Sequence, residues 1–357
     1  MHRWLALIGL LAVTMPRAAT SPQQKAEESP ASSQTPLAPR AAKTEGSPTD
    51  DLARLENIED SIRQRKHQEA VPLLQAYLKD FPKSSRAYYD LGYATFRTHD
   101  FRTSITSLSK SLSLNSHNPQ AHKILGLDCS FVGRYDLAEQ ELREAIRQKP
   151  GSAEIHYFLG RLFYTRGVYP LAKEELEEAL RLDPQYMKAW DNLGLTMEVL
   201  GNNARALKCY TTAMNLNEEE QLRSEWPYVN VSAFYNRQVQ PDLAIAYARK
   251  AIGFNPRSAP AHVQLARAYR VLGDWQKCAE AAQKAVDLNP WTSDAYYVLG
   301  IALRKLGKIQ ESQAAMAKFE QIHKEEQIDL PQKLGGIADR VMGGHPGPLN
   351  PDEEPSR

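Results

Sequence analysis

A leucine, or once a valine, followed by a glycine or another small residue returns along this chain at an almost constant spacing. Six successive small residues can be reached from the first one, in steps of 34 residues except for one step of 38. The repeated position is occupied by Gly92, Gly126, Gly160, Gly194, Ser232, Ala266 and Gly300. Self-similarity at a fixed period of this length predicts an array of repeats, in which each unit packs mainly on its neighbours.

Each repeat has the pattern of two helices. In the segment 187–220, apolar and small residues fall at i, i+3, i+4 and i+7, which places them on one face of a helix, and a second such face follows. The first face contains Trp190, Leu193, Gly194 and Met197, and the second contains Ala206, Tyr210 and Ala213. Gly201 lies between the faces and suits a left-handed turn, while Gly194 allows a close approach of the two helices. The unit is therefore predicted to be a helical hairpin.

The same segment permits a second interpretation, a small active site. Trp190, Asp191 and Asn192 follow one another directly and carry groups that catalytic sites use. The repeat accounts for Trp190 and the glycines as packing residues. Only Asn192 keeps a functional interpretation, because its position is expected to face away from the core.

These residues resemble the tetratricopeptide repeat family. Its unit of 34 residues has an aromatic residue, Leu-Gly three residues later, small residues in the second helix and a closing proline. The aromatic slot holds Trp190 here, and Asp183-Pro184 closes the preceding unit. The resemblance implies an all-α fold, a right-handed superhelical solenoid of about eight helical hairpins. These units are 51–84, 85–118, 119–152, 153–186, 187–220, 225–258, 259–292 and 293–326.

Two units depart from the family pattern. The first lacks Leu-Gly and is either a true repeat or an N-terminal cap. The sixth has Val231-Ser232 in its place and follows a four-residue insertion, where we expect the superhelix to change pitch.

The segments outside the repeats have different compositions. Residues 1–19 combine a basic start with an apolar run of twelve residues, which predicts a signal peptide, with an uncleaved anchor as the alternative. Residues 20–50 and 343–357 contain few large apolar residues and are expected to be a disordered linker and tail. Residues 327–342 are expected to form a short helix that caps the last unit. We therefore expect an exported protein, periplasmic or secreted, without a membrane span once the signal is removed.

The sequence offers no chemistry typical of an enzyme. It has no HExxH, GxSxG or P-loop motif and no Cys-x-x-Cys, so we expect no cofactor, no metal and no catalytic residue. Cys129, Cys209 and Cys278 lie in units that do not adjoin one another and are interpreted as packing residues. His122 and His156, like His262, occupy the aromatic slot of separate units, which favours packing over metal binding. With a net charge of +1, the chain is not expected to bind nucleic acid.

The resemblance implies that the first helix of each unit lines a concave groove in which protein partners lie. Positions one, two, five and eight residues after the aromatic slot are expected to point into this groove. Aromatic and arginine side chains are frequent binding hot spots, and asparagine can bind a partner's backbone. The candidate partner-binding residues are Tyr89, Tyr93, Phe96, Tyr157, Arg161, Tyr164, Asn192, Asn230, Arg267, Arg270, Tyr297 and Arg304.

We therefore expect a non-catalytic protein interaction scaffold of the cell envelope or secreted fraction, which binds a peptide or protein segment in this groove. The alternative is an accessory subunit that recruits an enzyme, or an assembly factor for the envelope or for secretion. The sequence indicates neither the partner nor the oligomeric state.

Overall fold

The computed structural model describes residues 48–327, and within this range the secondary structure is entirely helical. Sixteen helices follow one another with short connections in the described part of the chain. They are α1 (Pro48–Arg63), α2 (His67–Asp80), α3 (Ser85–Arg97), α4 (Phe101–Leu114), α5 (Pro119–Phe131), α6 (Tyr135–Gln148), α7 (Ala153–Thr165), α8 (Tyr169–Leu182), α9 (Met187–Val199), α10 (Asn203–Glu219), α11 (Trp226–Arg237), α12 (Pro241–Phe254), α13 (Ala259–Leu272), α14 (Trp275–Leu288), α15 (Ser293–Lys305) and α16 (Ile309–Gln327).

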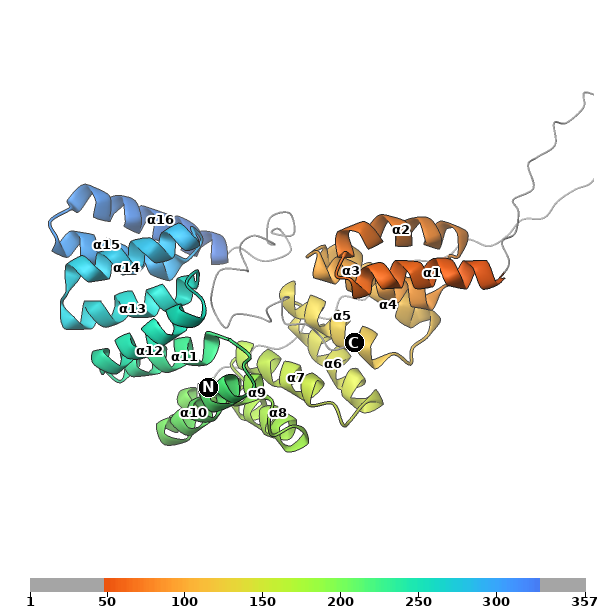
Figure 1. The fold of residues 1–357 in the computed structure, drawn as a ribbon, viewed down its shortest axis with the longest axis horizontal. Coiled ribbons are helices and arrows are strands. Elements are labelled where there is room, and N and C mark those ends of the chain that lie inside the picture. Colours follow the sequence, from red (N-terminus) through yellow and green to blue (C-terminus); the bar gives the residue numbers. More distant parts are fainter. Residues whose placement is uncertain (1–47, 328–357) are drawn as a thin grey trace, which may run out of the picture. The chain divides into compact units, whose positions relative to one another are not determined.

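The helices pair into antiparallel hairpins, and each hairpin packs on the next one along the chain (Figure 1). Odd-numbered helices are the first helices of the units, here called A helices, and even-numbered helices are the B helices. Small residues on the B helices are fully buried where they meet the A helices, as at Ala138, Ala172 and Ala206. The chain is thus an all-α solenoid, as the repeat predicts.

Close approach explains the glycine at position 194. A Cβ atom on Gly194 would lie 2.5 Å from Cδ1 and Cε1 of Tyr210, a side chain of α10 with no exposed surface. Gly201 has a different role, because its φ of 78° lies in the left-handed region that favours glycine at the end of α9. The two glycines therefore serve the packing and the turn of one hairpin.

The insertion before the sixth unit forms an ordered loop between α10 and α11. Asn217, which is 1% exposed, donates from Nδ2 to the carbonyl of Ser224 at 3.0 Å and accepts from the amide of Ser224 at 2.9 Å. The hydroxyl of Tyr228 donates to Glu218 Oε1 at 2.7 Å. The buried side-chain amide of Asn217 thus closes the loop. Tyr228, in the aromatic slot of the following unit, bonds the start of α11 to the end of α10.

In several units the residue in the aromatic slot also anchors the turn that precedes its A helix. Trp190 Nε1 donates to the carbonyl of Pro184 at 2.9 Å, and His122 Nε2 lies 3.1 Å from the carbonyl of Ser116. Both contacts span six residues, and His156 bonds the backbone of Pro150 in the same way. The histidines of the slot therefore hold the turns between the repeats.

Several predicted segments lie outside the described residues. These are the signal peptide 1–19, nearly all of the linker 20–50, the cap 327–342 beyond Gln327, and the tail 343–357. The predicted linker overlaps α1 by three residues, because α1 begins at Pro48. Within residues 48–327, no helix is both long and apolar enough to span a bilayer.

Candidate functional site

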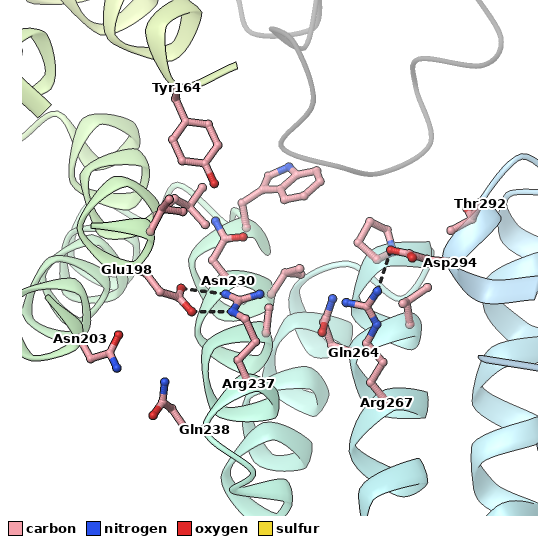
Figure 2. Close-up of a pocket in the computed structure, with 17 residues that line it drawn as sticks. Tyr164, Glu198, Asn203, Asn230, Arg237, Gln238, Gln264, Arg267, Thr292 and Asp294 are labelled. Carbon is pink, nitrogen blue, oxygen red and sulfur yellow. Dashed lines mark hydrogen bonds and ion pairs between the residues drawn. The ribbon is translucent and has the colours of Figure 1, made fainter. Parts of the chain in front are cut away.

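A pocket of about 450 Å³ lies against the A helices of the last five units. Its walls come from α7, α9, α11, α13 and α15, with one residue from α10 (Figure 2). Ligand pockets typically measure about 300–1,000 Å³. The lining residues are Tyr164, Leu195, Glu198, Val199, Asn203, Trp226, Val229, Asn230, Ala233, Arg237, Gln238, Pro260, Val263, Gln264, Arg267, Thr292 and Asp294.

Equivalent positions of successive repeats supply much of this lining. Asn230 and Gln264 both stand two residues after the aromatic slot of their units, on α11 and α13. Trp226, Pro260 and Asp294 all stand two residues before the slot. Since successive A helices lie side by side, the repeat places an amide next to an amide along the wall. The pocket is therefore a product of the repeat itself.

Glu198 and Arg237 form an ion pair on the wall between α9 and α11. Arg237 Nη2 donates to Glu198 Oε2 at 2.8 Å and its Nε donates to Oε1, so the pairing is bidentate (Figure 2). Tyr210 adds its hydroxyl to the same Oε2 at 3.0 Å. Burial and the Glu198 carboxylate raise the pKa of Tyr210 well above its usual range, so the phenol stays a donor. Burial tends to lower the pKa of Arg237, but the bond to Glu198 raises it overall.

A second ion pair lies on the opposite wall. Arg267 Nη2 of α13 is 2.8 Å from Asp294 Oδ2 of α15 (Figure 2). Between the two pairs, Asn236 Nδ2 of α11 donates to the carbonyl of Gln264 at 2.9 Å. Each contact joins one A helix to the next A helix along the chain. The polar part of the wall is therefore fixed by bonds between units.

Three predicted residues, Tyr164, Asn230 and Arg267, come together in this pocket. They come from three different A helices. The amide of Asn230 is engaged within the protein, because its Nδ2 donates to Asp191 Oδ2 at 2.8 Å. Asn230 therefore helps to join α9 to α11 as well as lining the pocket.

The other predicted residues do not line this pocket. Phe96 is 1% exposed and packs against Phe131 with ring centroids 6.3 Å apart, which is a core position. Asn192 donates to the carbonyl of Lys188 in its own helix at 2.9 Å. Tyr297 packs against Phe319 of α16. The remaining members of the set also lie on A helices and outside this pocket. Tyr89 and Tyr93 are on α3, which does not line the pocket, while the others are on α7 (Tyr157 and Arg161), α13 (Arg270) and α15 (Arg304).

Sequence reasoning missed several lining residues that its own rule would have found. Glu198 stands eight residues after the slot of its unit and Gln264 stands two residues after, both at positions expected to face the groove. They were passed over because the selection favoured aromatic residues, arginine and asparagine. Trp226 and Asp294 precede the slot, and no feature of the pattern indicated them.

The cysteines show no sign of reactivity. All three are buried free thiols. Burial raises the pKa of Cys129 to about 12 and the pKa of Cys209 and of Cys278 to about 11, so each stays protonated at neutral pH. Among residues 48–327, no three histidine, cysteine or acidic side chains gather as metal ligands would.

Known proteins share this repeat. The profile of the tetratricopeptide repeat matches residues 58–119, 131–186 and 259–290. The chain contains tetratricopeptide repeats. The matched ranges include α7 and α13, two of the helices that line the pocket.

Three individual proteins are similar to parts of this chain. Tetratricopeptide repeat protein 37 of Xenopus laevis is 29% identical over 122 residues, which are 32% of this chain and only 8% of that relative. A solved tetratricopeptide repeat protein from Parabacteroides merdae superposes with a TM-score of 0.61 at 16% identity, covering 71% of this chain and 99% of the other. Pseudomonas aeruginosa PilF gives a TM-score of 0.49 at 20% identity, over 59% of this chain and 94% of PilF. The P. merdae structure shows the fold.

Tetratricopeptide repeats are generally non-catalytic modules that bind other proteins. The matched repeats therefore support a protein interaction scaffold for this chain.

Proposed function

We propose that this protein is a non-catalytic scaffold that binds a segment of another protein against the A helices of its last five units. The observation that carries the proposal is the pocket described above, to which five successive A helices contribute. It combines apolar walls with amide side chains at repeated positions, an arrangement suited to an extended peptide. We further propose that the protein is exported and acts in the cell envelope or outside the cell, on the basis of residues 1–19.

Photocrosslinking in the native compartment tests the binding site. A photoreactive residue would replace Asn203, which is exposed and lines the pocket. The control replaces Leu243, which is exposed on α12 outside the pocket. We expect one protein to be crosslinked from position 203 and not from position 243. Equal products from both positions, or none from position 203, would count against this site.

Export has its own test. The protein would be recovered from the cell fractions and its N-terminus sequenced. We expect a mature chain that begins near Thr20 and an envelope or extracellular location. A cytoplasmic protein that retains Met1 would remove this part of the proposal while leaving the binding site untouched.

A further inference from the structure

The charged groups on the pocket wall neutralise one another. Glu198 is paired with Arg237, and Arg267 is paired with Asp294. The rest of the lining is apolar or carries uncharged polar groups, and Trp226 and Val263 are examples of the apolar part. A charged ligand would have to compete with ion pairs that are already formed. The pocket therefore suits a stretch of peptide that is mainly apolar and has no net charge.

The chain leaves its last described helix beside this pocket. Helix α16 runs antiparallel to α15 (Figure 1). Ser312 Oγ, near the start of α16, donates to the carbonyl of Gly300 at 2.7 Å. Further along α16, Phe319 packs against Tyr297, nearer the start of α15, with ring centroids 5.3 Å apart. At about 1.5 Å per residue, the eight residues from Phe319 to Gln327 carry the chain roughly 8 Å past the level of Asp294, which lines the pocket.

The residues that follow have the composition that the pocket favours. Residues 328–334 read IDLPQKL, with Ile328, Leu330 and Leu334 as apolar side chains and one charge of each sign. The residue before a proline prefers an extended backbone, which here applies to Leu330. Residues 20–47 differ, because Leu37 is their only large apolar residue.

The segment is longer than the roughly 8 Å by which the end of α16 passes the level of Asp294. An extended chain advances about 3.3 Å per residue, so five residues span roughly 16 Å. Because residues 328–334 follow α16 directly, their effective concentration at the pocket is in the millimolar range. At this concentration the segment occupies the pocket even if it binds weakly.

We propose that residues 328–334 bind in the pocket as an intramolecular ligand, which a partner segment must displace. The inference rests on the proposed function, since it assigns a competitor to the same site. The apparent affinity for a partner is then reduced in proportion to the fraction of molecules in which the pocket is open. A partner would be captured only if it binds better than the tethered segment.

Amide hydrogen exchange on the full chain, read by mass spectrometry, tests the proposal. We expect residues 328–334 to exchange at least about tenfold more slowly than in a synthetic peptide of residues 328–342. Leu330→Asp should abolish this protection. Pro260→Glu should also abolish it, because it places a charge on the pocket wall at the N-terminal end of α13, where an acidic residue is tolerated by the helix.

Pro241→Glu is the matched control, because Pro241 also stands at the start of a helix but lies outside the pocket. It should leave the protection unchanged. Protection that is absent in the natural sequence, or that survives Pro260→Glu, would overturn the inference. The second result would place the segment elsewhere, such as over the end of the solenoid.

Crosslinking from position 203 separates this inference from the proposed function. If only the inference fails, the partner is still crosslinked and Leu330→Asp does not increase its yield. If the proposed function fails, no specific partner is crosslinked, whatever the exchange of residues 328–334. If both hold, Leu330→Asp increases the yield.

Discussion

His122 and Glu141 are joined across one repeat unit, from the aromatic slot on α5 to the B helix α6. His122 Nδ1 lies 2.6 Å from Glu141 Oε2, and the two residues are 19 positions apart. The next unit has the same contact at the same separation, between His156 and Glu175 at 2.7 Å. In a later unit His262 occupies the slot, but an alanine stands 19 positions further on.

These three histidines are expected to titrate in a defined order. Burial tends to lower the pKa of His122 and of His156, but the bonds to their glutamates raise each pKa above the usual value. Burial lowers the pKa of His262, where no glutamate opposes it. Proton NMR titration of the imidazoles should show His262 losing its proton at a lower pH than the other two.

Glu141→Gln should lower the pKa of His122 and leave the pKa of His156 unchanged. Because the folded pKa of His122 is raised, the pair stabilises the fold fully below pH about 6.5 and loses this effect as the pH rises through the folded pKa. The variant should therefore cost about 1–2 kcal/mol near pH 5.5 and less at pH 9. A cost that does not change with pH would show that the pair is not ionised in this way.

Gly194→Ala should destabilise the protein by about 1–3 kcal/mol, because the added methyl group would overlap the ring of Tyr210. Gly253→Ala is the control, since nothing lies within 4 Å of a Cβ atom at that position near the end of α12. It should be neutral or stabilising by roughly 0.5 kcal/mol. Urea unfolding followed by circular dichroism measures both, and equal effects would contradict the close-packing role of Gly194.

The sequence predicted the repeat and its packing better than it predicted the pocket. The spacing of the Leu-Gly pairs predicted that two helices approach closely at Gly194. This prediction was possible because the packing at Gly194 involves only helices of one unit. The pocket depends on contacts between units, such as the bond from Arg237 to Glu198 across 39 residues. Such contacts depend on the rotation between adjacent hairpins. The spacing of the repeat in the sequence does not determine this rotation. The positions expected to face the groove include those of Glu198 and Gln264. Both residues were left out because only aromatic residues, arginine and asparagine were considered as binding residues.

Asp128 is a fully buried carboxyl group in contact with Ser104. Ser104 Oγ lies 2.5 Å from Asp128 Oδ2 and 2.9 Å from the carbonyl of Gly92. A hydroxyl has one proton, so it can donate to only one of these oxygens. A protonated Asp128 resolves this, since it donates to Ser104 and Ser104 donates to Gly92. Burial raises the pKa of Asp128 well above its usual value, in agreement with this arrangement.

Asp128→Asn should therefore stabilise the protein at neutral pH. A raised folded pKa means that the carboxyl contributes most below its unfolded pKa of about 4 and progressively less as the pH rises toward the folded pKa. The asparagine amide keeps the donor and does not titrate, so the advantage of the variant should grow by up to about 1.4 kcal/mol per pH unit in that range. Thermal unfolding between pH 4 and pH 8 measures it. A variant that is equally less stable at every pH would indicate that Asp128 is ionised in the fold.

The ion pair between Glu198 and Arg237 should be stronger than an ordinary surface pair. The side chain of Glu198 is only 11% exposed while that of Arg237 is 50% exposed, so the two partners should respond differently to substitution. Arg237→Gln leaves a largely buried carboxylate without its cation and should cost about 1–3 kcal/mol. Glu198→Gln should cost less, because the released guanidinium can reach water. A double-mutant cycle should give a coupling energy of about 1–2 kcal/mol.

The pair of Arg181 with Glu178 provides the comparison. It lies within one helix, with side chains 66% and 34% exposed, so water screens it and its coupling should be clearly weaker. Urea unfolding gives both cycles. Because the bond from Arg237 joins α9 to α11 across the insertion, Arg237→Gln should also increase amide exchange along the pocket wall at 226–238, while substitution of Arg181 should not. Equal coupling in the two pairs would mean that Glu198 is solvated and that its ion pair with Arg237 does not hold this wall of the pocket.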